Sequence, residues 1–351
     1  MAKSNSQRSG VIEVFALDGG NTNIKFAVKG STQVGKMPSC IREIDTSIYD
    51  LEYPIDDPNS AIVEYEGVSY LVGALAYQQG GLPIFQLGSS YGAGKAEYMK
   101  IMFMAALRDI DQLSSCPVIE QLNILVPDAR RNHLQETWNY VGEEITDITE
   151  FHVNGKLIRP QVREVKFISE GIPSFQFVKS HGLFDAYAAI PGISDFGILD
   201  IGGGESTFKL IDINTGQINW ESEVTMPGLN ALAESISTVL KSQSGIRLSP
   251  ELPHILSCLS IQRYIYQAPG VSAFDFESVY LAVRNRWAIR ILQTIAPKFG
   301  GTVGSIAVVG GGAHHAEDLC RKVEDGRLFV PTEDVTGVDP QKINAISLTY
   351  L

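Results

Sequence analysis

The chain carries one short pattern twice. The first copy, Val11–Val28, reads VIEVFALDGGNTNIKFAV, and the second copy, Phe196–Asp212, reads FGILDIGGGESTFKLID. Each copy is an apolar, β-rich run that ends in an aspartate, followed by a glycine-rich turn and a second β-rich run. The opening half recurs at Ser305–His315 as SIAVVGGGAHH. Two acidic, glycine-rich hairpins and a late glycine turn are the elements with which a chain can hold a nucleotide from two sides.

Helical patterns follow these strand-and-turn units. The clearest is Ala96–Ile110, whose apolar side chains recur at helical spacing and form a methionine-rich stripe. A buried core stripe is a better interpretation of it than an adaptable groove for a partner. Further helices are expected at Arg131–Val141, Leu229–Leu240, Glu277–Ala296, Ala316–Val323 and Pro340–Tyr350, and further strands at Ala61–Tyr65, Ser69–Val72, Leu122–Val126, Glu150–Val153, Val162–Ile168, Gln217–Val224 and Ile306–Val309.

The repetition of these units in two halves predicts an α/β fold built by duplication, with a cleft between the halves. Residues 1–10 are expected to form a disordered tail. We expect a first domain at residues 11–195, with a small inserted subdomain at about 30–93, and a second domain at residues 196–338.

Composition limits the classes of partner. A formal net charge of −12 and a pI near 5.0 argue against a direct grip on nucleic acid, which needs clustered Lys and Arg, so an adaptor protein is expected to carry any DNA contact. The cysteines lack metal-ligand spacing and favour reduced thiols in a reducing cytoplasm; they are Cys40, Cys116, Cys258 and Cys320. A polar start and the lack of any run of ~20 apolar residues predict a cytosolic protein without a membrane segment.

The turn of the first hairpin has the chemistry of a phosphate site. Gly19 and Gly20 let the backbone approach a phosphate closely. Asp18, at the strand end, would face a Mg²⁺ ion through water, and Lys25 would neutralise phosphate charge. Additional small donors are Asn21, Thr22 and Asn23. A plain β-turn uses the same residue types, so this hairpin alone does not decide the matter.

The second hairpin repeats this chemistry, and a purely structural turn rarely needs three successive glycines after a buried strand. Its candidate residues are Asp200, Gly202, Gly203, Gly204, Ser206 and Thr207. In the third motif, Gly310, Gly311 and Gly312 leave room for a flat base or ribose against the backbone.

Two other patterns are set aside. The segment Gly88–Lys95, GSSYGAGK, resembles a P-loop but has one residue too many and Ala96 where Ser or Thr must bind Mg²⁺. We expect it to be the loop that opens the methionine-rich helix. His314 and His315 are adjacent and cannot chelate a metal like an i, i+4 pair, so a capping or solvent role is expected.

Glu170 is the candidate hydrolytic residue. It follows a β-rich run and precedes Gly171-Ile172-Pro173. A carboxylate fixed by a rigid turn at the mouth of a cleft suits orientation of water for attack on a γ-phosphate. A solvent-exposed glutamate at a turn is the simpler interpretation of this segment by itself.

Three segments, ALDGGNTNIKFAV, ILDIGGGESTFKLID and IAVVGGGA, resemble the phosphate-1, phosphate-2 and adenosine motifs of the actin, sugar-kinase and chaperone ATPase superfamily. Within it, DGGNTNIK and SEGIPSF look most like the ParM-type bacterial actins of plasmid segregation. The resemblance implies a two-domain actin-like fold, Mg-ATP in the central cleft, and ATP-driven polymerisation into filaments that hydrolysis turns over. It also implies that Glu170 is catalytic, that Asp18 and Asp200 lie near Mg²⁺, and that residues 339–351 form a helix returning to the first domain.

The sequence departs from this family at two places. Phe208-Lys209 stands where many relatives have an acidic residue, and ILVPDARRN replaces a more usual Gly-Leu-Pro sequence. Two other functions remain open: a monomeric small-molecule kinase of the same fold, and a non-enzymatic, nucleotide-gated adaptor. The sequence is silent on filament strand number and handedness, on plasmid segregation versus cell shape, and on ATP versus GTP.

Overall fold

The computed structural model describes residues 10–31, 33–45, 57–87, 94–109, 116–129, 132–242, 250–267, 273–298, 300–321 and 326–351. The chain divides into two compact units. Unit 1 comprises Met1–Pro173 and Asn344–Leu351, and unit 2 comprises Ser174–Ile343. The sequence analysis places the domain boundaries at 195/196 and 338/339, whereas the units divide at 173/174 and 343/344. The expected tail, residues 1–10, lies outside the described residues except for Gly10.

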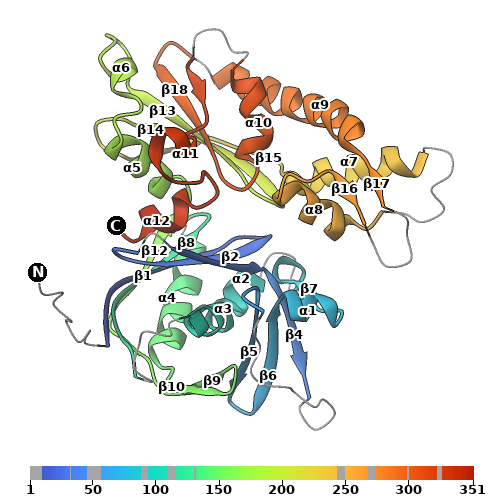
Figure 1. The fold of residues 1–351 in the computed structure, drawn as a ribbon. Coiled ribbons are helices and arrows are strands. Elements are labelled where there is room, and N and C mark those ends of the chain that lie inside the picture. The colour runs from blue at the N-terminus through green and yellow to red at the C-terminus, as the bar shows by residue number, and fades with distance from the viewer. Residues whose placement is uncertain are drawn as a thin grey trace, which may run out of the picture. The chain divides into compact units, whose positions relative to one another are not determined.

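The main sheet of unit 1 has the order β11-β8-β1-β2-β3, with β12 also paired to β8 (Figure 1). Strands β1 (Val11–Gly19) and β2 (Asn23–Val28) form the expected antiparallel hairpin. On the other side of β1, strand β8 (Val118–Val126) and then β12 (Val165–Ser169) run parallel to it. The remaining members are β3 (Val34–Pro38) and β11 (Gln161–Val162).

A second sheet of unit 1 has the order β10-β9-β5-β6-β4-β7, and its hairpin β5–β6 matches the strands expected at Ala61–Tyr65 and Ser69–Val72 (Figure 1). Its strands are β4 (Cys40–Ile44), β5 (Ser60–Tyr65), β6 (Val68–Gly73), β7 (Leu82–Pro83), β9 (Phe151–Val153) and β10 (Lys156–Ile158). Short helices α1 (Ala74–Gln78) and η1 (Ile84–Gln86) accompany it.

The helix expected at Ala96–Ile110 is broken. Helix α2 (Gly94–Glu97) ends at a turn at Tyr98, and α3 (Met99–Ala106) continues into η2 (Leu107–Asp109). Helix α3 contacts β1 and β2 of one sheet and β5 and β9 of the other. Because both sheets pack against it, all its residues from Ile101 to Ala106 are buried, which confirms the core interpretation of the methionine stripe. Helix α4 (Asn132–Thr146) packs beside it.

Unit 2 is built on a sheet with the order β15-β14-β13-β18-β19 (Figure 1). Strands β13 (Asp195–Ile201) and β14 (Glu205–Asp212) form the second predicted hairpin, and β15 (Ile218–Pro227) follows after a turn. Strand β18 (Val303–Val309) runs parallel to β13 and is buried along its whole length. Strand β19 (Leu328–Phe329) pairs with β18 at the edge.

Helices α7, α9 and α10 of unit 2 pack together and share one apolar core with the sheet. Helix α9 matches the helix expected at Glu277–Ala296, and Trp287 is buried near its centre. The helices and short elements are α6 (Asp185–Ala188), α7 (Leu229–Ser242), α8 (Leu252–Ser260), β16 (Ile265–Tyr266), β17 (Phe274–Asp275), α9 (Glu277–Ile295), η3 (Ala296–Lys298), α10 (Ala313–Cys320) and α11 (Glu333–Thr336).

The chain passes between the units inside or beside a helix. It enters unit 2 within α5 (Ile172–Ser180), and it leaves at the start of α12 (Ile343–Leu348). After that point the C-terminal residues belong to unit 1. Leu348 packs against Ala16 and Leu125, and the fully buried Asn123 donates a 2.7 Å hydrogen bond from Nδ2 to the Leu348 carbonyl oxygen.

Candidate nucleotide site

In unit 1, the first glycine turn and Glu170 lie beyond the same edge of the sheet. Asp18 of β1 and Ile168 of β12 are both paired with Leu125 of the parallel strand β8 that separates them. Since neighbouring strands lie about 4.8 Å apart, these two positions are separated by roughly 10 Å. Strand β1 ends just before Gly20, and strand β12 ends just before Glu170, so both residues lie at the carboxyl edge of the sheet.

Both glycines of the first turn are closely packed against neighbouring atoms. A Cβ atom on Gly20 would lie 2.8 Å from the backbone oxygen of Asn23, and one on Gly19 would lie 3.3 Å from Sδ of Met102. Ser39 adds support by donating a short hydrogen bond from its hydroxyl to the Gly20 carbonyl oxygen. Asn21, Thr22 and Asn23 are half-buried. The turn is therefore a compact backbone surface of the kind that a phosphate can approach.

Asp18 and Lys25 form an ion pair within this hairpin. They face each other across β1 and β2, with Lys25 Nζ 3.3 Å from Asp18 Oδ2. The side chain of Lys25 is 13% exposed and that of Asp18 is 9% exposed. The lysine that sequence analysis assigns to phosphate thus neutralises the carboxylate at the same strand end. Both charged groups of the pair thus lie beside the Gly19–Gly20 turn.

Glu170 is held by its backbone at the end of β12. Its N–H donates a 2.8 Å hydrogen bond to the Val126 carbonyl oxygen, which extends the ladder between β8 and β12 by one residue. Gly171 follows with φ of 95°, a left-handed conformation that favours glycine, and α5 begins at Ile172. The side chain of Glu170 is partly exposed, and Lys95 Nζ lies 4.0 Å from its Oε1.

In unit 2, the second aspartate and the glycine triad also meet at one sheet edge. Asp200 of β13 is paired with Val309, the last residue of the parallel strand β18, so Gly310 directly follows it. A Cβ on Gly310 would lie 2.2 Å from Asp200 Oδ1, and the φ of this glycine is 88°. A Cβ on Gly312 would lie 2.2 Å from Ile201 Cγ2. Gly311, in contrast, has no atom of a described residue within 4 Å of a Cβ position.

The turn of the second hairpin is fastened to the start of α7. Backbone amides of Leu229 and Asn230 donate hydrogen bonds to the carbonyl oxygens of Gly202 (3.0 Å) and Gly203 (2.8 Å). Gly202, Gly203 and Gly204 are half-buried. Ser206 is fully buried, and its hydroxyl donates to the Pro227 carbonyl oxygen at 3.4 Å. Thr207 is half-buried and is the residue paired with Asp200.

Lys209, the departure from the family pattern, is a buried residue of β14. It is 1% exposed, its Nζ lies 3.6 Å from Oε1 of Glu223, and the ammonium lies 5.2 Å from the centre of the Trp220 ring. A buried lysine needs such an anion and an aromatic face to offset its lost hydration. Through these contacts Lys209 packs within the sheet as a buried structural residue.

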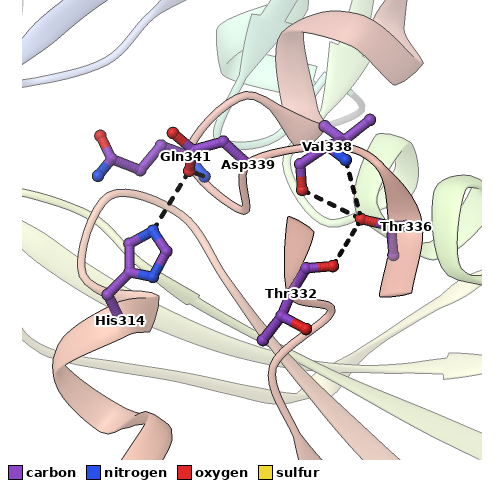
Figure 2. Close-up of polar contacts among 6 residues, drawn as sticks. All are labelled: His314, Thr332, Thr336, Val338, Asp339 and Gln341. Carbon is purple, nitrogen blue, oxygen red and sulfur yellow. Dashed lines mark hydrogen bonds and ion pairs between the residues drawn. The ribbon is translucent and has the colours of Figure 1, made fainter. Parts of the chain in front are cut away.

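The two adjacent histidines have different surroundings. His315 is 3% exposed, and its Nδ1 lies 2.8 Å from the hydroxyl of Tyr280; burial lowers the pKa of His315 to about 4. His314 Nε2 lies 3.3 Å from Asp339 Oδ1 (Figure 2). This hydrogen bond raises the pKa of His314 and lowers that of Asp339. Neither is the solvent or capping residue that the sequence analysis expects.

The residues at these turns suit a nucleotide with a hydrated metal ion. Within the described ranges, no group of three or more His, Cys, Asp or Glu side chains is placed to hold a metal ion by itself. Mg²⁺ usually keeps several waters and takes one or two carboxylates plus phosphate oxygens. Asp18 and Asp200, each at a strand end beside a glycine turn, fit that mode of binding.

In the same described ranges, no helix is both long and apolar enough to cross a membrane.

Comparisons with known proteins identify the fold. No protein-family model matches the sequence, and no curated protein matches it either. Solved structures do match: an archaeal actin homologue, Ta0583, in complex with ADP has a TM-score of 0.72 at 13% identity, with 97% of this chain and 98% of that chain covered. The chain has the actin-like fold. The apo ParM protein of pSK41 has a TM-score of 0.66 at 13% identity, with 97% and 96% of the two chains covered.

A third structure is a 15-stranded ParM filament from Clostridium botulinum, with a TM-score of 0.69 at 15% identity and coverage of 96% and 97%. At these identities the comparison establishes the actin-like fold alone.

Sequence analysis did not identify Lys95 as a candidate. It set the segment ending at Lys95 aside as a failed P-loop, and the structure describes that segment only from Gly94 onward. The one available signal was a lysine at the start of a helix after a glycine-rich stretch, which does not reveal a neighbour 75 positions away in the chain. The Tyr280–His315 contact was missed for the same reason.

Proposed function

We propose that this chain is an actin-like ATPase that binds Mg-ATP, polymerises into filaments, and hydrolyses ATP to drive filament turnover. Its role would be DNA segregation, as on plasmids, or a related bacterial cytoskeletal task, with a separate adaptor protein making the DNA contact. The observation that carries the proposal is that each unit has an aspartate and a constrained glycine turn at the carboxyl edge of its sheet.

Each unit contributes a different part of nucleotide recognition. The Gly19–Gly20 turn with Asn21, Thr22 and Asn23, and the Gly202–Gly204 turn with Thr207, would bind phosphate oxygens through backbone and side-chain donors. Gly311, with open space above it, would receive the ribose or base. Mg²⁺, held through water by Asp18 and Asp200, would supply positive charge to the phosphates.

Glu170 is the residue to which we assign hydrolysis. Its carboxylate would orient a water molecule and accept its proton as the water oxygen bonds to the γ-phosphorus. The bond from that phosphorus to the bridging oxygen breaks, and its electron pair leaves on ADP. The proton then passes from Glu170 to the phosphate product. A fixed backbone at the end of β12 serves this role, because proton acceptance requires a well-placed carboxylate.

Polymerisation rests on the fold comparison, in which two neighbours are filament structures. Sedimentation of the wild type at micromolar concentrations, with Mg-ATP, with Mg-ADP and without nucleotide, tests it. The proposal predicts a pellet with Mg-ATP and release of phosphate. ATP binding without pellet or phosphate would indicate the nucleotide-gated adaptor, and ATP use that depends on an added sugar would indicate the small-molecule kinase.

A further inference from the structure

We propose that Lys95 is a positioning residue for Glu170, holding the carboxylate in the orientation from which it acts on water. This inference rests on the proposed ATPase function. It starts from the ion pair between Lys95 Nζ and Glu170 Oε1, which lie 4.0 Å apart with side chains only 18% and 21% exposed. An ammonium at that distance from a partly buried carboxylate attracts it and restricts its rotamers.

The backbone before Lys95 is fixed by close packing. A Cβ on Gly94 would lie 1.9 Å from the Ile84 carbonyl oxygen and 2.7 Å from that of Leu87, so the start of α2 lies directly against the η1 segment. The Gly94 carbonyl oxygen also accepts a 2.9 Å hydrogen bond from the Tyr98 amide. Lys95 therefore extends from an anchored position, which reduces the entropy lost when it orders Glu170.

The same helical segment also contacts the glycine turn. Met99 and Met102, one and two turns beyond Lys95, lie under Gly19, within 3.7 Å and 3.3 Å of a Cβ built there. Lys95 lies in α2, before the turn at Tyr98, and the two methionines lie in α3, after it. One short stretch of chain thus contacts both halves of the candidate site in unit 1.

Lys95 forms no bond and transfers no proton in this account. Lys95 instead affects the placement of the Glu170 carboxylate. Misplacement of a catalytic group can lower the reaction rate about 100-fold. The backbone of Glu170 is held by Val126, but nothing in that hydrogen bond fixes the carboxylate. The charge contact between Lys95 Nζ and Oε1 acts on the carboxylate itself.

Lys100 provides a matched control. It lies on α3, its Nζ is 2.8 Å from Oε1 of Glu144, and both side chains are 23% exposed. It is thus a lysine of similar burial that pairs with a glutamate other than Glu170, on helix α4. Lys100→Met removes a closer lysine–glutamate ion pair, together with a contact to the Tyr65 ring, and does not change either residue of the Lys95–Glu170 contact.

The test is phosphate release at saturating Mg-ATP, with affinity measured separately by titration of a fluorescent ATP analogue. Lys95→Met is expected to lower the rate constant roughly 10- to 100-fold with the dissociation constant changed less than about threefold. Lys95→Arg should recover part of the rate, and Lys100→Met should retain the wild-type rate. The double variant Lys95→Met/Glu170→Gln should be no slower than Glu170→Gln alone, because both changes disable one group.

Other results overturn the inference. A dissociation constant raised tenfold or more would make Lys95 a direct phosphate ligand, as would losses that multiply in the double variant. Equal rate losses in Lys95→Met and Lys100→Met would indicate only general structural damage. If the wild type binds the analogue but releases no phosphate, the proposed ATPase function itself fails and the role of Lys95 fails with it.

Discussion

His314 Nε2 lies 3.3 Å from Asp339 Oδ1, and the contact joins the first turn of α10 to the segment that leads into α12 (Figure 2). Asp339 Oδ1 also accepts a 2.9 Å hydrogen bond from the Gln341 amide. Upstream, the Thr336 hydroxyl donates to the Thr332 carbonyl oxygen, and the Val338 amide donates to the Thr336 hydroxyl. The residue that follows the Gly310–Ala313 turn therefore helps to order the chain just before it returns to unit 1.

This pair predicts a pH-dependent contribution to stability. Its hydrogen bond raises the pKa of His314 above the ordinary 6.5 and lowers that of Asp339 below the ordinary 3.8. The pair contributes its full stabilisation between pH 3.8 and pH 6.5, the ordinary pKa values of the two groups. It is lost as pH rises through the raised pKa of His314, and as pH falls through the lowered pKa of Asp339. His314→Gln should therefore lose about 1 kcal/mol of unfolding free energy at pH 5.5 and almost none at pH 9.

The measurement is denaturant unfolding of both proteins at several pH values. His315, whose buried ring has a pKa near 4, destabilises the fold as pH falls from 6.5 towards 4, but it is present in both proteins. The charge of His314 also helps to lower the pKa of His315, so the two curves are compared from pH 5.5 to 9, above the folded-state pKa of His315, where their difference reports His314. A difference that stays constant from pH 5.5 to 9 would contradict the ion-pair account.

Gly311→Ala should separate folding from nucleotide binding. In the part of the chain that the structure describes, nothing lies within 4 Å of the new Cβ, so the thermal unfolding temperature should match that of the wild type. If the space above Gly311 receives ribose or base, the methyl group should weaken ATP binding roughly tenfold, as an overpacked contact does. Equilibrium titration of a fluorescent ATP analogue measures this.

Two variants calibrate the result. Gly300→Ala also adds a methyl group into open space, but in a loop outside the candidate site, and should bind as the wild type does. Gly312→Ala should lower stability because its Cβ would overlap Ile201. Wild-type affinity of Gly311→Ala would exclude this glycine from the nucleotide site.

Lys209 is predicted to matter for stability and not for turnover. Lys209→Ala removes a side chain that is 1% exposed and its contacts with Glu223 and Trp220, and should cost about 2–4 kcal/mol. Lys209→Met refills most of the volume, and Glu223, whose side chain is 21% exposed, can be hydrated, so a smaller loss is expected. Unfolding free energy and ATP turnover per folded protein are the two measurements. A lowered turnover in Lys209→Met would assign this residue to the site.

The strands and turns of the candidate site follow from local sequence. Apolar runs that end in Asp18 and Asp200 before glycines define strand ends, and the structure places both at carboxyl edges. Glu170 likewise follows directly after β12, as its position after a β-rich run indicates. Local patterns suffice here because strand ends and turns depend on neighbouring residues.

Other features depend on distant residues and could not be predicted. The apolar spacing of the sequence continues through Tyr98, but the helix in the structure is broken there. The burial of Lys209 depends on Glu223 and Trp220 of the next strand. The proximity of Lys95 to Glu170 arises from packing of α2 against η1. Such contacts are set by tertiary packing, which residue spacing does not encode.

The most direct test of the central claim is right-angle light scattering after addition of Mg-ATP to the wild type and to Glu170→Ala, with negative-stain microscopy of the end points. Removal of the carboxylate should slow hydrolysis by about 10²- to 10⁴-fold without loss of ATP binding. We predict wild-type filaments that form and later disassemble, and Glu170→Ala filaments that persist. Absence of scattering from both proteins, despite measurable ATP binding, would contradict the account of this chain as a polymerising ATPase.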